Sequence, residues 1–346
     1  MDAFETTAGA ACSPNATPKG AILPGLVAAA RTRSGNTYLK AIGRAYVDGS
    51  ETQSLQSDGV FYIASLSKLI TTVAVLQCVE RGQLNLDQDI TTVLPEWANV
   101  QVLTGFDDNG KPTTQPTTTP ITLRMLLTHT SGMAYDFFHP HLIKYRSALG
   151  LPLGFQHTIH ETFARVLLHP PGQIFEYSPG LDWAGLMIER VTGLKLGEYM
   201  QRNIFDPLGI PRGRIGFNVE ELAGEVVPRT ERAEDGTLST LREADGRPRR
   251  HVVNTDHQGG GGLFARAEDY LTVLAGVFLT DNPTILKRET IDLMHNHQIA
   301  DRALLHRCLV TSAPKIMVNN AMGPLPHDTS IGFGLGGLLT ESDAPA

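Results

Sequence analysis

The longest apolar segment of the chain runs from Leu66 to Arg81 and contains neither glycine nor proline. Its apolar residues are spread over nearly every side of a helix of this length, a pattern typical of helices in the interior of a domain. Gly82 follows directly, and glycine is common just after a helix C-terminus. The segment is therefore predicted to form a buried helix.

A second pattern, near the N-terminus, predicts a β-hairpin. Residues 23–49 begin with an apolar run, turn at Ser34–Asn36, and return through Tyr38, Leu39 and Ile42. Turn-forming residues between two such runs are typical of paired antiparallel strands.

The other segments predict a mixture of helices and strands. Residues 1–23 are rich in Ala, Pro and Thr and predict an irregular arm. Residues 121–132 and 161–210 have helical spacing that Pro and Gly interrupt. Residues 259–279 predict a strand or loop followed by a helix, and residues 331–340 predict a Gly-rich strand.

The order of these elements predicts how the chain is divided. Strands occur near both ends, and most of the predicted helices lie between them. This order predicts an α/β part built from residues 1–80 and 255–346, around a mainly helical region at 81–254.

The composition of the chain limits the kinds of molecule that it is expected to bind. The chain has 346 residues, of which 41% are hydrophobic, enough for a large core. Its net charge is −7 and it has no basic block, which argues against a nucleic-acid or membrane partner. No apolar run has the length of a membrane span and the N-terminus lacks a secretory signal, so we expect a cytoplasmic protein.

The three cysteines give no sign of a metal site. Cys12, Cys78 and Cys308 are far apart and odd in number, and we expect reduced thiols. No His, Cys and Asp cluster has ligand spacing, so neither a metal nor another cofactor is expected.

The pair Ser65 and Lys68 carries the candidate chemistry. Residues three apart lie on one face of a helix, so Lys68 can reach the Ser65 hydroxyl at the helix N-terminus. A serine nucleophile needs an adjacent base, and a lysine becomes a base when burial lowers its pKa. The alternative is structural: Ser65 caps the helix and the Lys68 ammonium reaches solvent.

Further segments, in order, resemble the serine β-lactamase-like family of class C β-lactamases, D-alanyl-D-alanine peptidases, family VIII esterases and acyltransferases. They are FYIASLSK, LLTHTSG, PGQIFEYSPGLDWAGLMIERVTG, IFDPLGI, GGGGLFARAEDY and GFGLGG. Within the family, KLITTVAVLQCVERG and VLTGFDDNGK look like the fungal acyltransferases of lovastatin biosynthesis. The resemblance implies an α+β fold of the β-lactamase/transpeptidase type, with an antiparallel sheet flanked by helices and a large helical region.

The resemblance also implies a site. Ser65 is then the acylated nucleophile, and Lys68 and Tyr177 carry protons. Tyr62 and Gly336 are expected at the substrate. The alternative for Tyr177 is a core tyrosine bonded to the backbone.

Two other residues receive structural expectations. His129 is expected to end a helix and to bond a loop rather than to act as a base. Trp183 is expected to pack in the helical region.

The implied reaction is a ping-pong cycle through an acyl-serine. The donor is a small-molecule thioester, free or bound to a carrier protein, or an ester. The acceptor is an alcohol of secondary metabolism, or water. The related acyltransferase has a basic residue where this chain has Tyr62, so we do not expect a cation there to hold a carboxylate-bearing acceptor.

The family's third motif, a short Gly-rich strand of the K-T-G kind, is not found before Ala346. We therefore expect the C-terminal strands of the fold to be missing. Three explanations stay open: a truncated product, a chain completed by another polypeptide or by a homodimer partner, and an inactive scaffold that serves as a binding or accessory protein. A β-lactam or D-Ala-D-Ala hydrolase is the enzymatic alternative.

Overall fold

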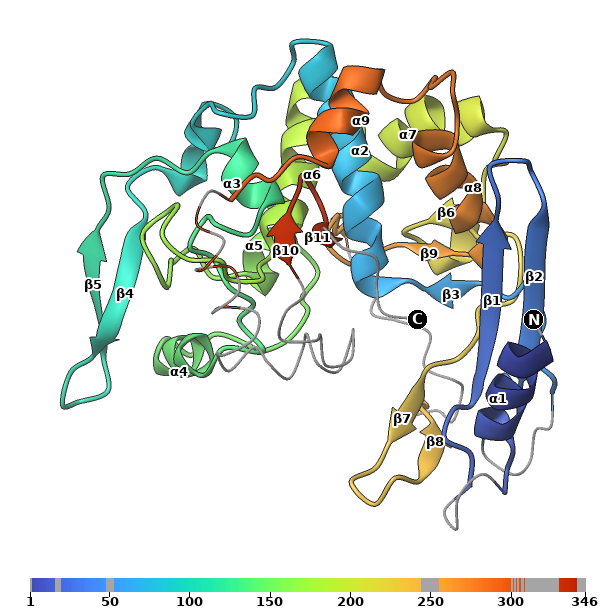
Figure 1. The fold of residues 1–346 in the computed structure, drawn as a ribbon. Helices are drawn as coiled ribbons and strands as arrows, with labels where there is room; N and C mark the ends of the chain where they lie inside the picture. The colour runs from blue at the N-terminus through green and yellow to red at the C-terminus, as the bar shows by residue number, and fades with distance from the viewer. Residues whose placement is uncertain are drawn as a thin grey trace. The chain divides into compact units, whose positions relative to one another are not determined.

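The structure, a computed structural model, describes residues 2–15, 20–47, 53–243, 255–299, 301, 303, 305, 308 and 330–340. The chain forms two compact units (Figure 1). The first contains Met1–Ala64, Gln201–Val253 and Gly262–Thr284, and the second contains Ser65–Met200, Asn254–Gly261 and Ile285–Ala346. These units group residues differently from the predicted domains, and the domain division stays a prediction.

The first unit carries most of the short strands. Its helices and strands are α1 (Asp2–Cys12), β1 (Gly25–Arg31), β2 (Thr37–Gly43), β3 (Phe61–Tyr62), β6 (Ile215–Gly216), β7 (Thr230–Arg232), β8 (Leu238–Thr240), β9 (Phe264–Ala265) and α8 (Ala267–Phe278). The strands β3, β9 and β6 form one antiparallel sheet in that order. The predicted hairpin is confirmed as β1 and β2, which pair from Gly25↔Gly43 to Arg31↔Thr37.

The expectation of an irregular N-terminal arm is wrong, because residues Asp2–Cys12 form α1. Its first turn holds Asp2 and Glu5, whose charges suit the positive end of a helix. Glu5 then forms an ion pair with Lys40 and accepts a hydrogen bond from the Tyr38 hydroxyl, both on β2. So short a helix depends on contacts of this kind.

The second unit is mainly helical. Its helices and strands are α2 (Ser67–Glu80), β4 (Gln101–Phe106), β5 (Pro112–Pro116), α3 (Leu123–Leu127), α4 (Pro140–Ala148), α5 (Ile159–Thr162), α6 (Gly180–Thr192), α7 (Leu196–Met200), α9 (Arg288–Met294), β10 (Ile331–Phe333) and β11 (Leu338–Thr340). Among the helices of the described residues, none is long and apolar enough to cross a membrane.

The helix α2 forms the centre of the second unit, as its apolar pattern predicts. Val73 and Val75, on nearly opposite sides of the helix, are both fully buried. α6 and α7 pack against it, and α3 packs against α6. Trp183 of α6 is fully buried and meets the ring of Trp97 edge-on at 5.1 Å, as expected of a residue that packs in the helical region.

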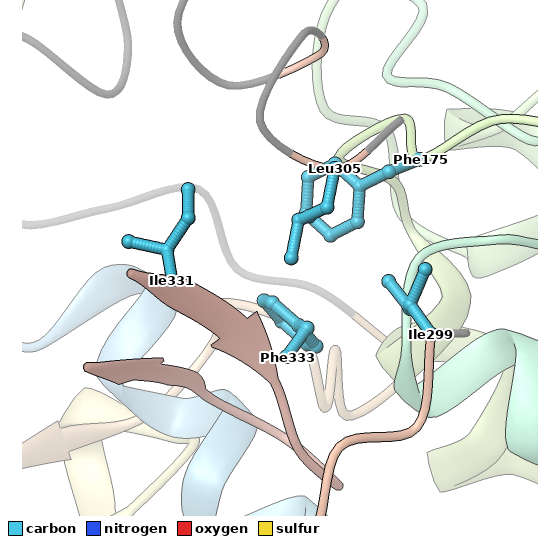
Figure 2. Close-up of a cluster of buried hydrophobic side chains, with 5 residues drawn as sticks. All are labelled: Phe175, Ile299, Leu305, Ile331 and Phe333. Atoms are coloured by element: carbon cyan, nitrogen blue, oxygen red, sulfur yellow. The ribbon is translucent and has the colours of Figure 1, made fainter. Parts of the chain in front are cut away.

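A small apolar cluster joins the C-terminal hairpin to the segment before α6. The prediction of a single Gly-rich strand at 331–340 is wrong, because the segment turns back on itself and forms the antiparallel pair β10 and β11. Figure 2 shows the side chains that meet there: Phe175, Ile299, Leu305, Ile331 and Phe333. The cluster fixes the chain two residues before Tyr177.

The turn between β10 and β11 lies unusually close to α2. Gly336 has φ +82°, and a Cβ there would lie 2.3 Å from Oγ1 of Thr72. The Thr72 hydroxyl in turn donates to the carbonyl of Lys68, at 2.9 Å. Only glycine suits both the left-handed backbone and this approach.

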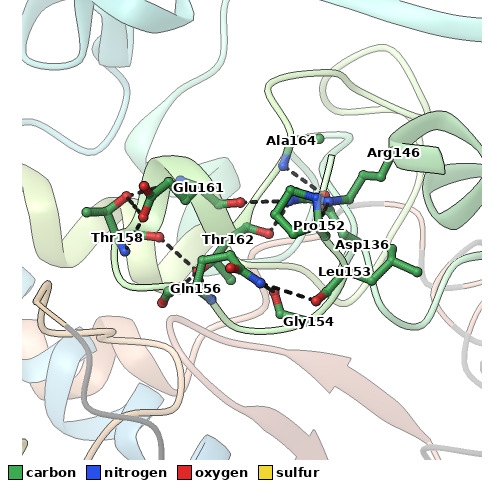
Figure 3. A network of polar contacts seen from close by, with 10 residues as sticks. All are labelled: Asp136, Arg146, Pro152, Leu153, Gly154, Gln156, Thr158, Glu161, Thr162 and Ala164. Atoms are coloured by element: carbon green, nitrogen blue, oxygen red, sulfur yellow. Dashed lines mark hydrogen bonds and ion pairs between the residues drawn. The ribbon is translucent and has the colours of Figure 1, made fainter. Parts of the chain in front are cut away.

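A buried ion pair organises the loop around α4 and α5. Arg146 and Asp136 are each 2% exposed in their side chains, and their closest atoms are 2.7 Å apart. Arg146 also donates to the carbonyls of Pro152, Glu161 and Thr162 (Figure 3). Its guanidinium thus has the several partners that a buried cation needs. The network anchors the residue next to Tyr135.

We expect Gly336→Ala to lower the free energy of unfolding by about 2–4 kcal/mol, from backbone strain and the clash with Thr72. Urea unfolding followed by circular dichroism measures this value. Gly337→Ala is the matched control, because a Cβ there meets no atom within 4 Å. The control should stay within about 0.5 kcal/mol of the parent chain. Equal effects of the two substitutions would contradict the close-packing argument.

Candidate active site

Ser65 lies on a tight turn directly before the buried helix. A 3-10 turn spans Ala64–Leu66, and α2 begins at Ser67. Ala64 has φ +44°, a left-handed conformation that a residue with a Cβ rarely adopts. Backbone strain of this kind occurs where a side chain must be presented, and Ser65 is exposed. The N-cap of α2 is Leu66 and has no side-chain cap bond, so the capping alternative for Ser65 is wrong.

Lys68 is 5% exposed, so its ammonium does not reach solvent as the same alternative required. Its Nζ donates to the hydroxyl of Ser65 at 3.3 Å, to the hydroxyl of Tyr135 at 2.9 Å, and to the carbonyl of Gly260 at 2.6 Å. An ammonium has three N–H groups, so all of them have an acceptor. Lys68 is therefore held with its nitrogen beside the Ser65 oxygen.

Two tyrosine rings lie against Lys68. The face of Tyr177 is 4.6 Å from Nζ, measured to the ring centroid, and that of Tyr135 is 5.3 Å away. Such cation–π contacts stabilise a desolvated ammonium. The ring of Tyr177 thus lies beside Lys68, and its role as a proton carrier stays a prediction. The phenol oxygen that accepts from Lys68 belongs to Tyr135.

Tyr135 is the residue at Lys68 that the sequence analysis did not select. It is 6% exposed, and its ring also contacts Phe137, Phe163 and Tyr177. The only sequence signal was its place three residues after the glycine of LLTHTSG. That position alone does not indicate a contact with Lys68.

His129 holds the segment that carries Tyr177. It has φ +57° and is 2% exposed. Its Nδ1 accepts the N–H of Ser178 at 3.2 Å, and its carbonyl accepts the N–H of Glu176 at 2.8 Å. Its ring lies 4.6 Å from that of Tyr177. These contacts give His129 a supporting position behind the tyrosine.

Electrostatics keep the His129 ring neutral. Burial, with a smaller effect from the charge of Lys68, puts the pKa of His129 well below its usual value. The neutral ring keeps Nδ1 free to accept the Ser178 N–H.

The two predicted substrate-binding residues lie in different units. Tyr62, on β3 of the first unit, packs against Phe264 at 5.3 Å and lies 5.9 Å from the guanidinium of Arg229. Gly336 lies in the second unit at the turn packed against Thr72. A substrate-binding role stays a prediction for both. Among the described residues, no group of three His, Cys, Asp or Glu side chains could hold a metal ion.

Comparisons with known proteins give consistent results. Residues 16–309 match the family described as Beta-lactamase. Lovastatin esterase of Penicillium rubens is 38% identical over 309 residues, which cover 88% of this chain and 76% of the esterase. Monacolin J acid methylbutanoyltransferase of Aspergillus terreus is 34% identical over 328 residues, covering 93% and 78%. A solved structure of a mutant Simvastatin Synthase from Aspergillus terreus superposes with a TM-score of 0.82 at 33% identity, covering 98% and 81%.

The buried neutral His129 makes stability depend on pH. Its pKa is lower in the folded protein than in the unfolded chain, so the unfolded chain binds more protons and stability falls as pH drops below about 6.5. One such group contributes up to about 1.4 kcal/mol per pH unit. We expect His129→Asn, whose side chain tolerates the left-handed backbone, to flatten this fall between pH 7 and pH 5.

Urea unfolding at several pH values measures that slope. His157→Asn is the matched control, because His157 is exposed and the same change is made there. The control should retain the slope of the parent chain. If His129→Asn retains the full slope as well, the buried ring is not its source.

Proposed function

Because this chain belongs to the Beta-lactamase family, we propose that it moves an acyl group from a thioester or ester to an alcohol or water through an acyl-Ser65 intermediate. The chain is an acyltransferase or esterase, the enzyme class to which its relatives belong. Its likeness to Simvastatin Synthase confirms the predicted β-lactamase/transpeptidase-like fold. That the C-terminal strands are missing stays a prediction.

The observation that carries the proposed mechanism is the buried Lys68 nitrogen, 3.3 Å from an exposed Ser65 hydroxyl. This is the pairing of nucleophile and base that acyl transfer through serine requires. The exposed hydroxyl is accessible to a donor, and the buried nitrogen is held in place by its three acceptors.

In the first half of the cycle, Ser65 Oγ attacks the acyl carbon as its proton moves to Lys68 Nζ in the unprotonated form. The bond from the acyl carbon to the leaving sulfur or oxygen then breaks, and the leaving group takes the proton from Lys68. The N–H of Ser65 at the start of α2 is assigned to the developing oxyanion. Tyr177 and Tyr135 flank the nitrogen while it carries the proton.

In the second half, an alcohol or water gives its proton to Lys68 and attacks the acyl-serine. The bond to Ser65 Oγ breaks, and the serine regains a proton from Lys68. Transfer and hydrolysis share this intermediate, which fits relatives that include both an esterase and an acyltransferase. The names of these relatives support a polyketide-type secondary metabolite as acceptor or ester. A carrier-protein thioester is the second form of donor in this proposal.

We expect incubation with butyryl-N-acetylcysteamine to add one butyryl group to the chain, seen by intact-protein mass spectrometry. Ser65→Ala should abolish the adduct, because Ser65 carries the exposed hydroxyl beside Lys68 Nζ, whereas the Tyr135 hydroxyl there is buried. Ser67→Ala, two residues away on the same motif, is the matched control and should retain it. A folded parent chain that gains no mass would refute acyl-enzyme formation.

The same assay shows whether an alcohol or water accepts the acyl group from Ser65. If the chain transfers, an added alcohol should speed loss of the adduct and appear as a butyrate ester. If it hydrolyses, only butyrate should accumulate. Rapid hydrolysis of nitrocefin, with slow turnover of acyl thioesters and esters, would favour the β-lactam hydrolase instead.

A further inference from the structure

A carboxylate is buried behind Lys68, and the mechanism above assigns it no role. Asp182 lies in the first turn of α6 and is 2% exposed. Its neighbours in that helix, Leu181, Trp183 and Ala184, are fully buried and apolar. Carboxylates are rarely buried in such surroundings unless a specific interaction holds them.

The backbone of Gly260 links Asp182 to Lys68. Its N–H donates to Oδ1 of Asp182 at 3.0 Å, and its carbonyl accepts from Lys68 Nζ at 2.6 Å. A Cβ on residue 260 would lie 2.2 Å from the Asp182 carboxylate, so the approach requires glycine. The backbone of this one residue thus binds the carboxylate through its N–H and the ammonium through its carbonyl.

The hydroxyl of Tyr135 lies at the same nitrogen atom. It accepts from Lys68 Nζ at 2.9 Å, and Tyr135 also lowers the pKa of the Asp182 carboxyl group. Asp182 is therefore placed to respond to the charge on Lys68.

The charged and titratable groups around Asp182 are few in the described part of the second unit. Lys68 faces it from α2, and Tyr135 faces it from the segment after α3. His129, from the same segment, is neutral because its pKa is well below its usual value. Gly260 contributes only its backbone N–H. Lys68 is thus the single cation among these partners.

Burial raises the pKa of the Asp182 carboxyl group to about 6. The charge of Lys68 and the hydrogen bonds from Gly260 and Tyr135 act in the opposite direction. The carboxylate is therefore charged at neutral pH, and because its pKa is higher than in the unfolded chain, it lowers stability as pH rises through 6. Because a charged Asp182 lowers the stability of the folded protein, its presence in the interior indicates a role in function rather than in stability.

We propose that Asp182 is a positioning residue for the general base: it holds the backbone of Gly260 on Lys68 and stabilises the ammonium that forms when Lys68 takes the Ser65 proton. The inference rests on the proposed function. In the acylation step described above, Asp182 itself gains no proton and forms no bond. Its role parallels that of a carboxylate that orients a base and stabilises its cation.

The test is Asp182→Asn, assayed by the rate of Ser65 acylation from butyryl-N-acetylcysteamine between pH 5 and pH 9. Asparagine has the same shape and still accepts the Gly260 N–H, so it removes charge and leaves the peptide in place. We expect the limiting rate at high pH to fall at least about tenfold. The pH of half-maximal rate should move down by about one unit, because Lys68 loses a stabilising negative charge. The midpoint of thermal unfolding at pH 8 should stay equal or rise.

Asp269→Asn is the matched control. Asp269 is also a buried aspartate, but it pairs with Arg214 in the first unit. The control should lower the unfolding midpoint and leave the pH profile of acylation unchanged. A profile of Asp182→Asn equal to that of the parent chain would overturn the inference. A lower rate with an unchanged half-maximal pH and a lower unfolding midpoint would also overturn it, because that result describes a structural residue.

Two further outcomes keep the test decisive. If Asp182→Asn gives no folded protein, Tyr135→Phe removes the hydroxyl that accepts from Lys68 and lowers the pKa of Asp182. This variant should shift the half-maximal pH in the same direction by a smaller amount; no shift would overturn the inference. If the parent chain itself forms no adduct, the proposed function fails first. That failure is distinct, because it is seen before any variant is compared.

Discussion

The surroundings of Ser65 in the second unit are organised around the buried ammonium of Lys68. This group lies on the buried helix α2, where an ion is stable only if each of its hydrogens has an acceptor. The three acceptors come from three separate stretches of chain: the turn that carries Ser65, the loop that carries Tyr135, and the segment that carries Gly260. These stretches must therefore close on a single nitrogen atom when the unit folds.

Close approach of backbone to α2 makes this arrangement possible. Gly260 and Gly336 both lie where a Cβ would collide with a neighbouring side chain. The first brings backbone N–H and carbonyl groups between Lys68 and the buried carboxylate of Asp182. The second brings the C-terminal hairpin against the turn of α2 that follows Lys68. His129 lies beside Tyr177, with its backbone in the left-handed conformation and its ring neutral.

Much of this could be predicted from the sequence where local pattern determines structure. The all-round apolar run predicted α2, its spacing placed Lys68 beside Ser65, and the turn at 34–36 predicted the first hairpin. Tyr177 followed only from the family resemblance. Tyr135 and Asp182 could not be predicted from the sequence. Their positions near Lys68 depend on how segments far apart in the chain pack together, and the spacing of residues within one segment does not show this. The helix α1 was not predicted for a related reason. A short helix rich in Ala and Thr has little stability of its own and depends on its contacts with β2.

The burial of Lys68 has a consequence for the durability of the enzyme. Two nucleophiles stand 3.3 Å apart, and an amine that attacks an activated acyl carbon forms an amide, which water does not readily cleave. The Ser65 oxygen is exposed, while the Lys68 nitrogen is covered by protein and bonded to three acceptors. In the proposed reaction, this arrangement directs each acyl group to the oxygen, from which it can leave again, and protects the lysine from inactivation by the donor.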